Sequence, residues 1–208
     1  DDENQVSDIL KSFPESLNVL RAAAVFTLKT SKGDGKSAIE KALQINTADP
    51  INHAILGLLN LNDPVSSVKS FETALQFWPE EPEWHRILAD LYTELGNTDK
   101  AADHITMAIQ AQPQNSAYWQ TRAGIHLQLN QLEEAKLDLE KSTELESQDP
   151  AGWLSMADVN RRLGNLTAAA ENINTAVTLK PDDSDIAIQE IKFLLDRQQY
   201  HKAAEKAA

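Results

Sequence analysis

The chain of 208 residues has no cysteine. It therefore has no disulfide, no thiol nucleophile and no thiolate ligand for a metal. Glycine and proline, the two residues that interrupt helices, are also few, with seven and eight copies. A chain with so few of them, and with much alanine, leucine, glutamate, glutamine and lysine, favours α-helix.

Positive charge is scarce as well. Lysine and arginine total 19 against 32 aspartate and glutamate, which gives a net charge of −13. Nucleic acids and anionic membrane surfaces both require clustered basic side chains, so we expect neither as a partner. No run of 18 apolar residues occurs, and the opening DDENQ lacks the basic segment of a signal peptide. We expect a soluble protein without direct membrane insertion, and we favour the cytoplasm.

What the chain does contain is a repeat. The stretch LGNTDKAADHITMAIQAQPQN (95–115) returns as LGNLTAAAENINTAVTLKPDD (163–183). The offset between the two copies, from Leu95 to Leu163, divides into two equal steps, and that step gives full units at 82–115, 116–149 and 150–183. We expect one array over 1–208, with shorter units at 17–49 and 50–81, the second helix of a truncated or capping repeat at 1–16, and a partial repeat at 184–208.

Each unit holds two apolar-periodic stretches joined by a short turn. Apolar residues recur at spacings of three and four, which is the stripe of an amphipathic helix rather than the alternation of a strand. Gly96 and Gly164 stand where a helix ends and a left-handed residue is favoured, and Asp63 before Pro64 is a helix start. The residues in phase are Trp119 and Trp153; Ala101, Ala135 and Ala169; and Ile105, Leu139 and Ile173.

These positions resemble the tetratricopeptide repeat family, whose pattern of about 34 residues reads W-x2-L-G-x2-Y … A-x3-F … P. Unit 82–115 has His85 where tryptophan is usual, and unit 116–149 departs most, with Arg122, His126 and Ser147 in place of leucine, tyrosine and proline. The resemblance implies an all-α fold, a right-handed α-solenoid of stacked antiparallel helix pairs. The matches in unit 82–115 are Leu88, Ala89, Tyr92, Ala101, Ile105, Ala108 and Pro113.

The alternation of small and large residues has a physical reason. A lone helix pair cannot bury both of its faces, so stacked pairs bury them against each other. Small residues let the helices approach closely, and large ones fill the gaps between them. We expect the small positions to be Ala89, Ala101, Ala123, Ala135, Ala157 and Ala169, and the large ones to include Trp119, Leu139, Trp153 and Ile173.

Two features suggest chemistry, but the residues favour structure. The stretch TSKGDGKS (30–37) is similar to a phosphate-binding loop, yet Thr30 stands where the first glycine must be, so we interpret it as a turn inside a helix pair. The five histidines make no metal-ligand spacing on one helix face, and His85 and His126 fall at repeat-core positions. With no nucleophile–base pattern either, we expect no enzyme, no cofactor and no metal.

The four tryptophans divide into two groups. Trp119 and Trp153 fall at the packing position of the repeat, so we expect them in the core. Trp78 and Trp84 flank a turn between repeats, in WPEEPEW, and are candidates for contact with a partner.

In this family the first helices of the units line a concave surface that usually holds a peptide or a helix of another protein. The resemblance therefore implies a non-catalytic scaffold for protein–protein interaction, whose partner is another protein or peptide. Two alternatives stay open: a structural spacer in a larger assembly or in a secretion or polysaccharide-export protein, and, more remotely, an enzyme. From the repeat phase, the groove should be lined by Arg21, Val25, Leu28, Ile51, Ala54, Leu58, Leu61, Arg86, Asp90, Gln120, Gln128, Leu154, Asp158, Arg161 and Arg162.

The first half of that groove should be apolar. The helix expected at 50–63 is apolar nearly all round, which leaves Ala54, Leu58 and Leu61 facing the concave side after its packing faces are satisfied. The downstream lining is polar. We therefore expect something to cover the apolar half: a partner's amphipathic segment, upstream repeats, or a second copy of the chain by self-association.

Overall fold

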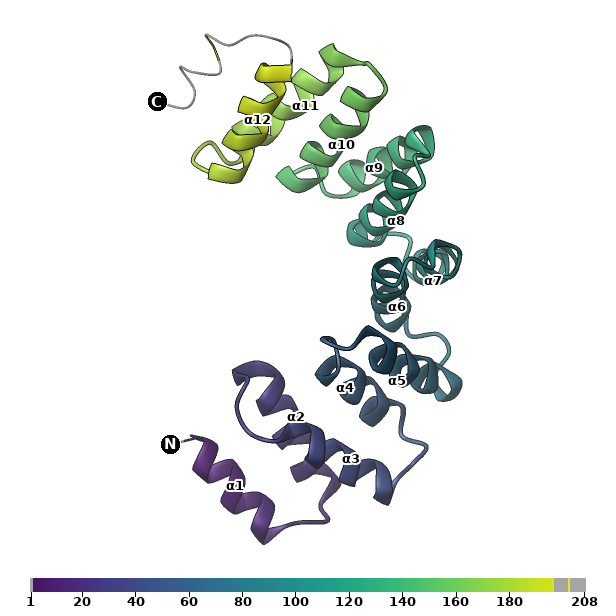
Figure 1. Ribbon diagram of the computed structural model, residues 1–208, viewed down its shortest axis with the longest axis vertical. Coiled ribbons are helices and arrows are strands. Elements are labelled where there is room, and N and C mark those ends of the chain that lie inside the picture. Colours follow the sequence, from purple (N-terminus) through teal and green to yellow (C-terminus); the bar gives the residue numbers. More distant parts are fainter. Residues whose placement is uncertain (1, 197–201, 203–208) are drawn as a thin grey trace. The chain divides into compact units, whose positions relative to one another are not determined.

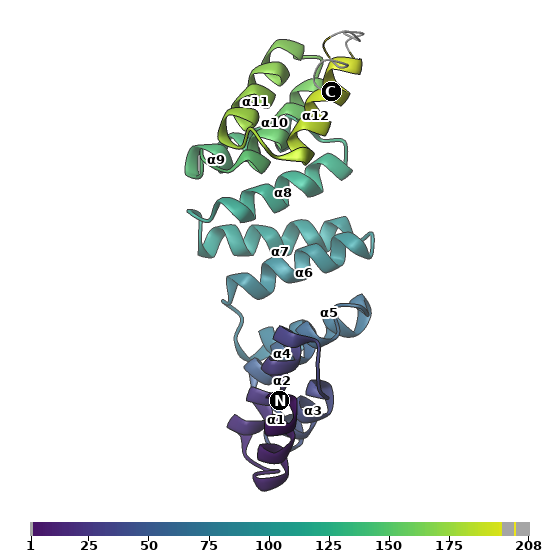
Figure 2. The same ribbon diagram turned by 90° about the vertical axis from the view of Figure 1, so that its left-hand side faces the viewer.

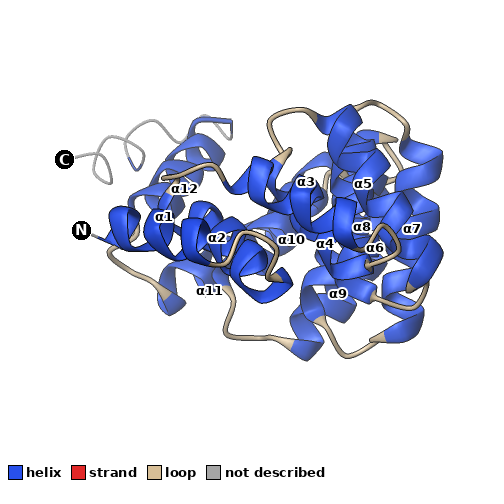
Figure 3. Cartoon of the chain, turned by 90° about the horizontal axis from the view of Figure 1, so that it is seen from below, coloured by secondary structure: helices blue, strands red, loops and turns tan. Residues whose placement is uncertain are grey.

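The computed structural model describes residues 2–196 and 202 (Figure 1). Over these residues it consists of twelve α-helices and contains no strand (Figure 3). The chain divides into two compact units, Asp1–Ala111 and Gln112–Ala208, called here the first and the second unit. The helices are α1 (Asp2–Ser12), α2 (Leu17–Thr30), α3 (Gly35–Ile45), α4 (Pro50–Leu59), α5 (Pro64–Phe77), α6 (Pro82–Glu94), α7 (Thr98–Ala111), α8 (Ser116–Gln128), α9 (Leu132–Leu145), α10 (Pro150–Arg162), α11 (Leu166–Leu179) and α12 (Ser184–Asp196).

Within each unit, consecutive helices form pairs and the pairs stack (Figure 2). In the first unit α2 packs on α3, α4 on α5 and α6 on α7, while α4 also contacts α2 and α3, and α5 contacts α6. In the second unit α8 packs on α9 and α10 on α11, while α9 contacts α10 and α11 contacts α12. The fold is all-α, and each unit is a piece of α-solenoid, which confirms the predicted fold class. The boundaries of the individual repeats stay a prediction.

The helix ends follow the signals in the sequence. Asp63 caps α5 by accepting the backbone N–H of Ser66 at 3.3 Å. Gly96 and Gly164 follow α6 and α10 with φ of 73° and 80°, the left-handed region in which a Cβ is strained. Ser31 ends α2 in the same left-handed region, so the stretch that is similar to a phosphate loop is the turn between α2 and α3, as predicted.

The two helices of a pair cross at small residues. A Cβ on Gly57 would lie 2.6 Å from the ring of Phe71, and a Cβ on Gly35 would lie 3.0 Å from the Cα of Ala24. On α5, Ser67 donates its hydroxyl hydrogen to the carbonyl oxygen of Gly57 at 2.9 Å, so the two backbones lie close together. Larger side chains would push the helices apart. Buried alanines take the same two places in the later pairs: Ala89 and Ala101, Ala123 and Ala135, Ala157 and Ala169.

In α4, α6, α8 and α10, the ring N–H of one residue reaches back to the turn before the helix. The acceptor is always the carbonyl oxygen six residues earlier. Histidine and tryptophan can both donate from a ring nitrogen, which explains how histidine replaces the usual tryptophan without loss of this contact. Trp119 and Trp153 are half-buried rather than enclosed in the core as expected, because they cover these turns. The bonds join His53 to Thr47 (2.8 Å), His85 to Pro79 (2.9 Å), Trp119 to Pro113 (2.9 Å) and Trp153 to Ser147 (2.8 Å).

A polar contact joins the two helices of each of the last two full pairs. Arg122 on α8 donates two hydrogen bonds to Asp138 on α9, at 2.8 and 2.6 Å, and His126 lies 3.5 Å from the same carboxylate. The bonds to Asp138 raise the pKa of Arg122, and its burial acts in the opposite direction. In the next pair Asn160 donates to Asn172 at 3.0 Å. The repeat at 116–149 departs from the family pattern, and the contact between Arg122 and Asp138 compensates for this within its own helix pair.

The pair α6–α7 carries a network of rings instead. The Nδ1 atoms of His85 and His104 lie 2.9 Å apart, and the His104 ring stacks on Tyr92, with centroids 5.6 Å apart. Because His85 donates from Nε2 to a carbonyl, its neutral ring must accept at Nδ1 the hydrogen that His104 donates. The hydroxyl of Tyr92 donates to Glu72 and accepts from Lys100 at 2.9 Å. Burial, and after it the neighbouring His85, lowers the pKa of His104.

The lowered pKa of His104 predicts a pH-dependent stability. Unfolding restores its ordinary pKa of 6.5, so the unfolded chain binds the proton more readily than the folded one. The contribution of His104 is complete above pH 6.5 and is lost as the pH falls below it. We expect urea unfolding, followed by circular dichroism, to show that the stability difference between the protein and His104→Gln shrinks between pH 7.5 and pH 5.5. If the free energies of unfolding of the two proteins changed equally with pH, the prediction would be wrong.

A matched pair of glycine substitutions tests the close crossing of α4 and α5. Gly57→Ala places a methyl group against the fully buried ring of Phe71, so we expect it to lower the free energy of unfolding by about 1–3 kcal/mol. Gly124, in the middle of α8, has no atom within 4 Å of an added Cβ. Gly124→Ala should therefore stabilise the protein by roughly 0.5–1 kcal/mol, because alanine is the better helix former. If both variants stabilise, the crossing is looser than described.

Candidate partner-binding surface

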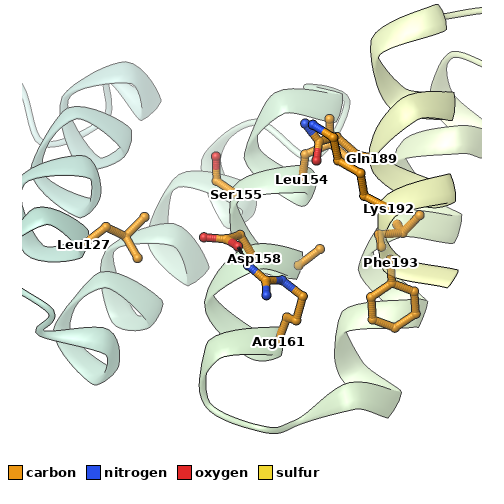
Figure 4. Close-up of a pocket in the computed structure, with 10 residues that line it drawn as sticks. Leu127, Leu154, Ser155, Asp158, Arg161, Gln189, Lys192 and Phe193 are labelled. Carbon is orange, nitrogen blue, oxygen red and sulfur yellow. Dashed lines mark hydrogen bonds and ion pairs between the residues drawn. The ribbon is translucent and has the colours of Figure 1, made fainter. Parts of the chain in front are cut away.

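A pocket of about 490 Å³ lies in the second unit, on the first helices of successive pairs (Figure 4). Leu127 from α8 stands at one end, and side chains of α12 stand at the other, with α10 between them. The volume suits a small number of side chains of a bound segment. The lining is Leu154, Ser155, Ala157, Asp158 and Arg161 from α10; Gln189, Lys192 and Phe193 from α12; Leu127; and Ile173 from α11.

Helix caps position the two helices that supply most of this lining. Asp149 accepts the backbone N–H groups of Ala151 at 3.0 Å and Gly152 at 3.3 Å, which starts α10. Asp183 does the same for α12, where it accepts the N–H groups of Asp185 at 3.0 Å and Ile186 at 3.2 Å. The lining residues of α10 then recur at spacings of three and four, which places them on one face of the helix.

The charged residues of the pocket differ in whether they have an ion-pair partner. Arg161 donates to Asp158 at 2.5 Å, and Arg162 lies 3.9 Å from the same carboxylate. Arg162 is itself held by the carbonyl oxygen of Leu127 at 3.4 Å and the side-chain oxygen of Asn130 at 3.1 Å. Within the described part of the chain, Lys192 has no carboxylate at ion-pair distance. The pocket therefore presents a cation that no described carboxylate neutralises, in a chain that is acidic as a whole.

Three of the residues predicted for the groove meet in this pocket: Leu154, Asp158 and Arg161. Arg162 lies beside it, and Gln128 is exposed but does not line it. Gln120 has a structural contact instead, because its side-chain amide donates to Asp149, the cap of α10, at 2.8 Å.

In the first unit Arg21 has an equivalent contact. Its guanidinium donates to Asp49, the cap of α4, and to the side-chain oxygen of Asn52 at 2.6 Å. Arg86 pairs with Glu83 at 2.6 Å and with Asp90 at 2.5 Å. Desolvation raises the pKa of Asp90, and the pair with Arg86 opposes that rise.

The apolar residues predicted for the first unit differ in exposure. Leu28, Ile51 and Leu61 are 36%, 43% and 46% exposed, so they are open to a partner. Val25 and Leu58 are half-buried, and Val25 packs against the core around Leu20 and Ile39. Ala54 is only 5% exposed and lies inside the helix packing, so the prediction that it faces the groove is wrong.

The residues from α12 were missed by the sequence reasoning, although a signal was present. Lys192 stands one repeat step after Asp158, and Gln189 stands one repeat step after Ser155. The repeat step that predicts Asp158 in the groove therefore also predicts Lys192 there. The predicted lining ended at Arg162 and did not include the partial repeat at 184–208.

The described residues contain no group of three or more histidine, aspartate or glutamate side chains arranged to hold a metal ion. None of the helices between residues 2 and 196 is both long and apolar enough to cross a membrane.

Comparison with known proteins agrees with the repeat pattern. Two models described as Tetratricopeptide repeat match residues 58–125 and 118–207. The chain belongs to the tetratricopeptide repeat family. Tetratricopeptide repeats are protein–protein interaction modules that bind other proteins or peptides, and proteins of the family are generally non-catalytic scaffolds. Among curated proteins, none matches this tetratricopeptide repeat protein significantly in sequence.

Solved structures share the fold over most of the chain. PilF of Pseudomonas aeruginosa is 18% identical with a TM-score of 0.77, over 94% of this chain and 90% of that one. A tetratricopeptide repeat protein from Parabacteroides merdae is 19% identical with a TM-score of 0.80, over 91% and 77%. YrrB, described as a tetratricopeptide repeat protein with an unusual peptide-binding site, is 15% identical with a TM-score of 0.71, over 90% and 97%. At these identities the likeness shows the fold alone.

Proposed function

We propose that the protein is a non-catalytic scaffold and that the pocket of the second unit holds a peptide or a helix of a partner protein. The observation that carries the proposal is the composition of the pocket from α8, α10 and α12. The first helices of three successive repeats offer a bound segment a surface that no single repeat could offer. The peptide-binding site that the description of YrrB mentions supports a peptide as the class of ligand.

The lining indicates which side chains the segment carries. Leu127 and Leu154, both half-buried, offer apolar contact, so one apolar side chain of the partner anchors there. Lys192 has no ion-pair partner among the described residues, so a carboxylate of the segment lies near its ammonium group. Asp158 stays neutralised by Arg161 and does not repel that carboxylate.

The alternative of a structural spacer predicts an empty pocket, and the exposed apolar residues of the first unit leave room for self-association as a separate property. The cytoplasmic location stays a prediction.

Selection of peptides from a display library tests the proposal. We expect peptides that pair an apolar residue with aspartate or glutamate. On binding, they should shift the backbone amide resonances of 154–158 and 189–193 in NMR spectra. Lys192→Glu should weaken binding about tenfold, the scale of one lost charge-assisted contact.

The control is Lys180→Glu, which makes the same charge change at an exposed residue outside the pocket. It should leave the affinity unchanged. If no peptide perturbs the pocket, or if both variants weaken binding equally, the proposed function is wrong and the spacer alternative gains support.

A further inference from the structure

A second surface lies in the first unit, where four aromatic rings from three helices form two contacting pairs. Phe77 and Trp78 are consecutive at the end of α5, and they contact neighbours on different helices. Phe77 stacks on His53 of α4, with centroids 6.2 Å apart and an interplanar angle of 12°. Trp78 meets Trp84 of α6 edge to face, with centroids 5.6 Å apart. We call His53, Phe77, Trp78 and Trp84 the aromatic ridge.

The ridge is open to solvent. Phe77 is 49% exposed and Trp78 is 46% exposed. Two neighbouring large aromatic side chains with half of their surface in water are unusual, because each gains free energy when it is buried. Exposed aromatic surface of this kind is a feature of interaction sites.

Acidic residues border the ridge. Trp78 and Trp84 are the ends of WPEEPEW, which holds Glu80 and Glu81 between the two indoles. Among the described residues no basic side chain lies at ion-pair distance from Glu80 or Glu81, whereas Glu83 pairs with Arg86. Two carboxylates without a basic partner among the described residues therefore lie in the turn that joins the two indoles.

Glu81 also differs from the residues that precede α4, α8, α10 and α12. Asp49, Asn115, Asp149 and Asp183 each accept backbone N–H groups of the helix that follows. The side chain of Glu81 makes no such bond to α6. Its carboxylate is not used in capping and is available to a ligand.

The turn between the indoles is held in place from both sides. The N–H of Trp78 donates to the carbonyl oxygen of Ala74 at 3.0 Å, and the ring of His85 donates to the carbonyl oxygen of Pro79 at 2.9 Å. Pro79 and Pro82 restrict the backbone further. A ligand would meet a surface that is already ordered, which lowers the entropy cost of binding.

We propose that the aromatic ridge, together with Glu80 and Glu81, binds a basic segment of a partner protein. An arginine or lysine side chain lies against the indole of Trp78, whose π face attracts a cation. Its charge is balanced by the carboxylates of Glu80 and Glu81. Charge complementarity selects this occupant, because the ridge is aromatic and acidic and has no free cation of its own among the described residues. The site is separate from the pocket of the second unit and does not depend on it.

The four tryptophans allow a direct test by NMR of the indole N–H groups. Those of Trp119 and Trp153 are hydrogen-bonded to backbone carbonyls and serve as internal controls. Resonances are assigned with Trp78→Phe and Trp84→Phe. We expect tetra-arginine with blocked ends to shift the resonances of Trp78 and Trp84 alone, with an affinity that falls as salt is added. Tetra-citrulline, which has the same length without the charge, should shift none.

A matched pair of charge variants tests the carboxylates. Glu80→Gln with Glu81→Gln should lower the affinity for tetra-arginine about tenfold. Glu133→Gln with Glu134→Gln removes two adjacent exposed carboxylates from the first turn of α9, and it should change the affinity by less than about twofold. Unfolding curves of both variants check that the fold is intact.

Four outcomes of the peptide experiments overturn the proposal. They are the absence of any shift at millimolar peptide, equal shifts with tetra-citrulline, shifts of all four indoles, and equal losses of affinity in the two double variants. A change in the Trp78 and Trp84 resonances with protein concentration alone also overturns it, because a second copy would then cover the ridge.

Discussion

The structure depends on how closely the two helices of each pair approach each other. Glycine, alanine or serine stands at both crossing positions in every pair from α2–α3 to α10–α11, and Ser67 bonds directly to the backbone of Gly57. At that separation the larger apolar residues can fill the space between neighbouring pairs, so stacking buries apolar clusters between them. The pocket in the second unit depends on the same spacing, since it is lined by the first helices of successive pairs.

Each of the last three helix pairs is held by a different polar contact between its two helices, although the apolar surfaces of the pairs are similar. The pair α6–α7 has stacked rings with a histidine–histidine bond, α8–α9 has Arg122 on Asp138, and α10–α11 has Asn160 on Asn172. A buried polar group left without its partner costs free energy. If a helix exchanged its partner for the corresponding helix of another pair, such groups would be left without their hydrogen-bond partners. These contacts therefore favour the correct partner among repeats whose apolar surfaces are alike.

The sequence was sufficient to predict the fold because the same helix pair recurs at a regular step along the chain. The constant repeat step predicted the helix pairs, the small crossing positions such as Ala101 and Ala135, and the turns at Gly96 and Gly164. It could not predict that Arg122 would find Asp138, since that contact depends on the rotation of one helix against another. For the same reason the predicted groove was only partly correct. Gln120 faces a helix cap, and the exposure of a residue such as Ala54 is decided by neighbours that a helical stripe does not specify.

The hydrogen bonds from the ring nitrogens to the turns all run from the following helix back to the preceding turn. Each donor lies in the helix that follows its turn, and it reaches back six residues to close that turn. No turn of this kind can be completed by the repeat that precedes it. During synthesis from the N-terminus, each of these four turns is therefore completed only when the beginning of the following helix has left the ribosome. A chain cut off directly after one of these turns would lack the ring bond of that turn, whereas a chain shortened from its N-terminal side would keep the ring bonds of all such turns that remain.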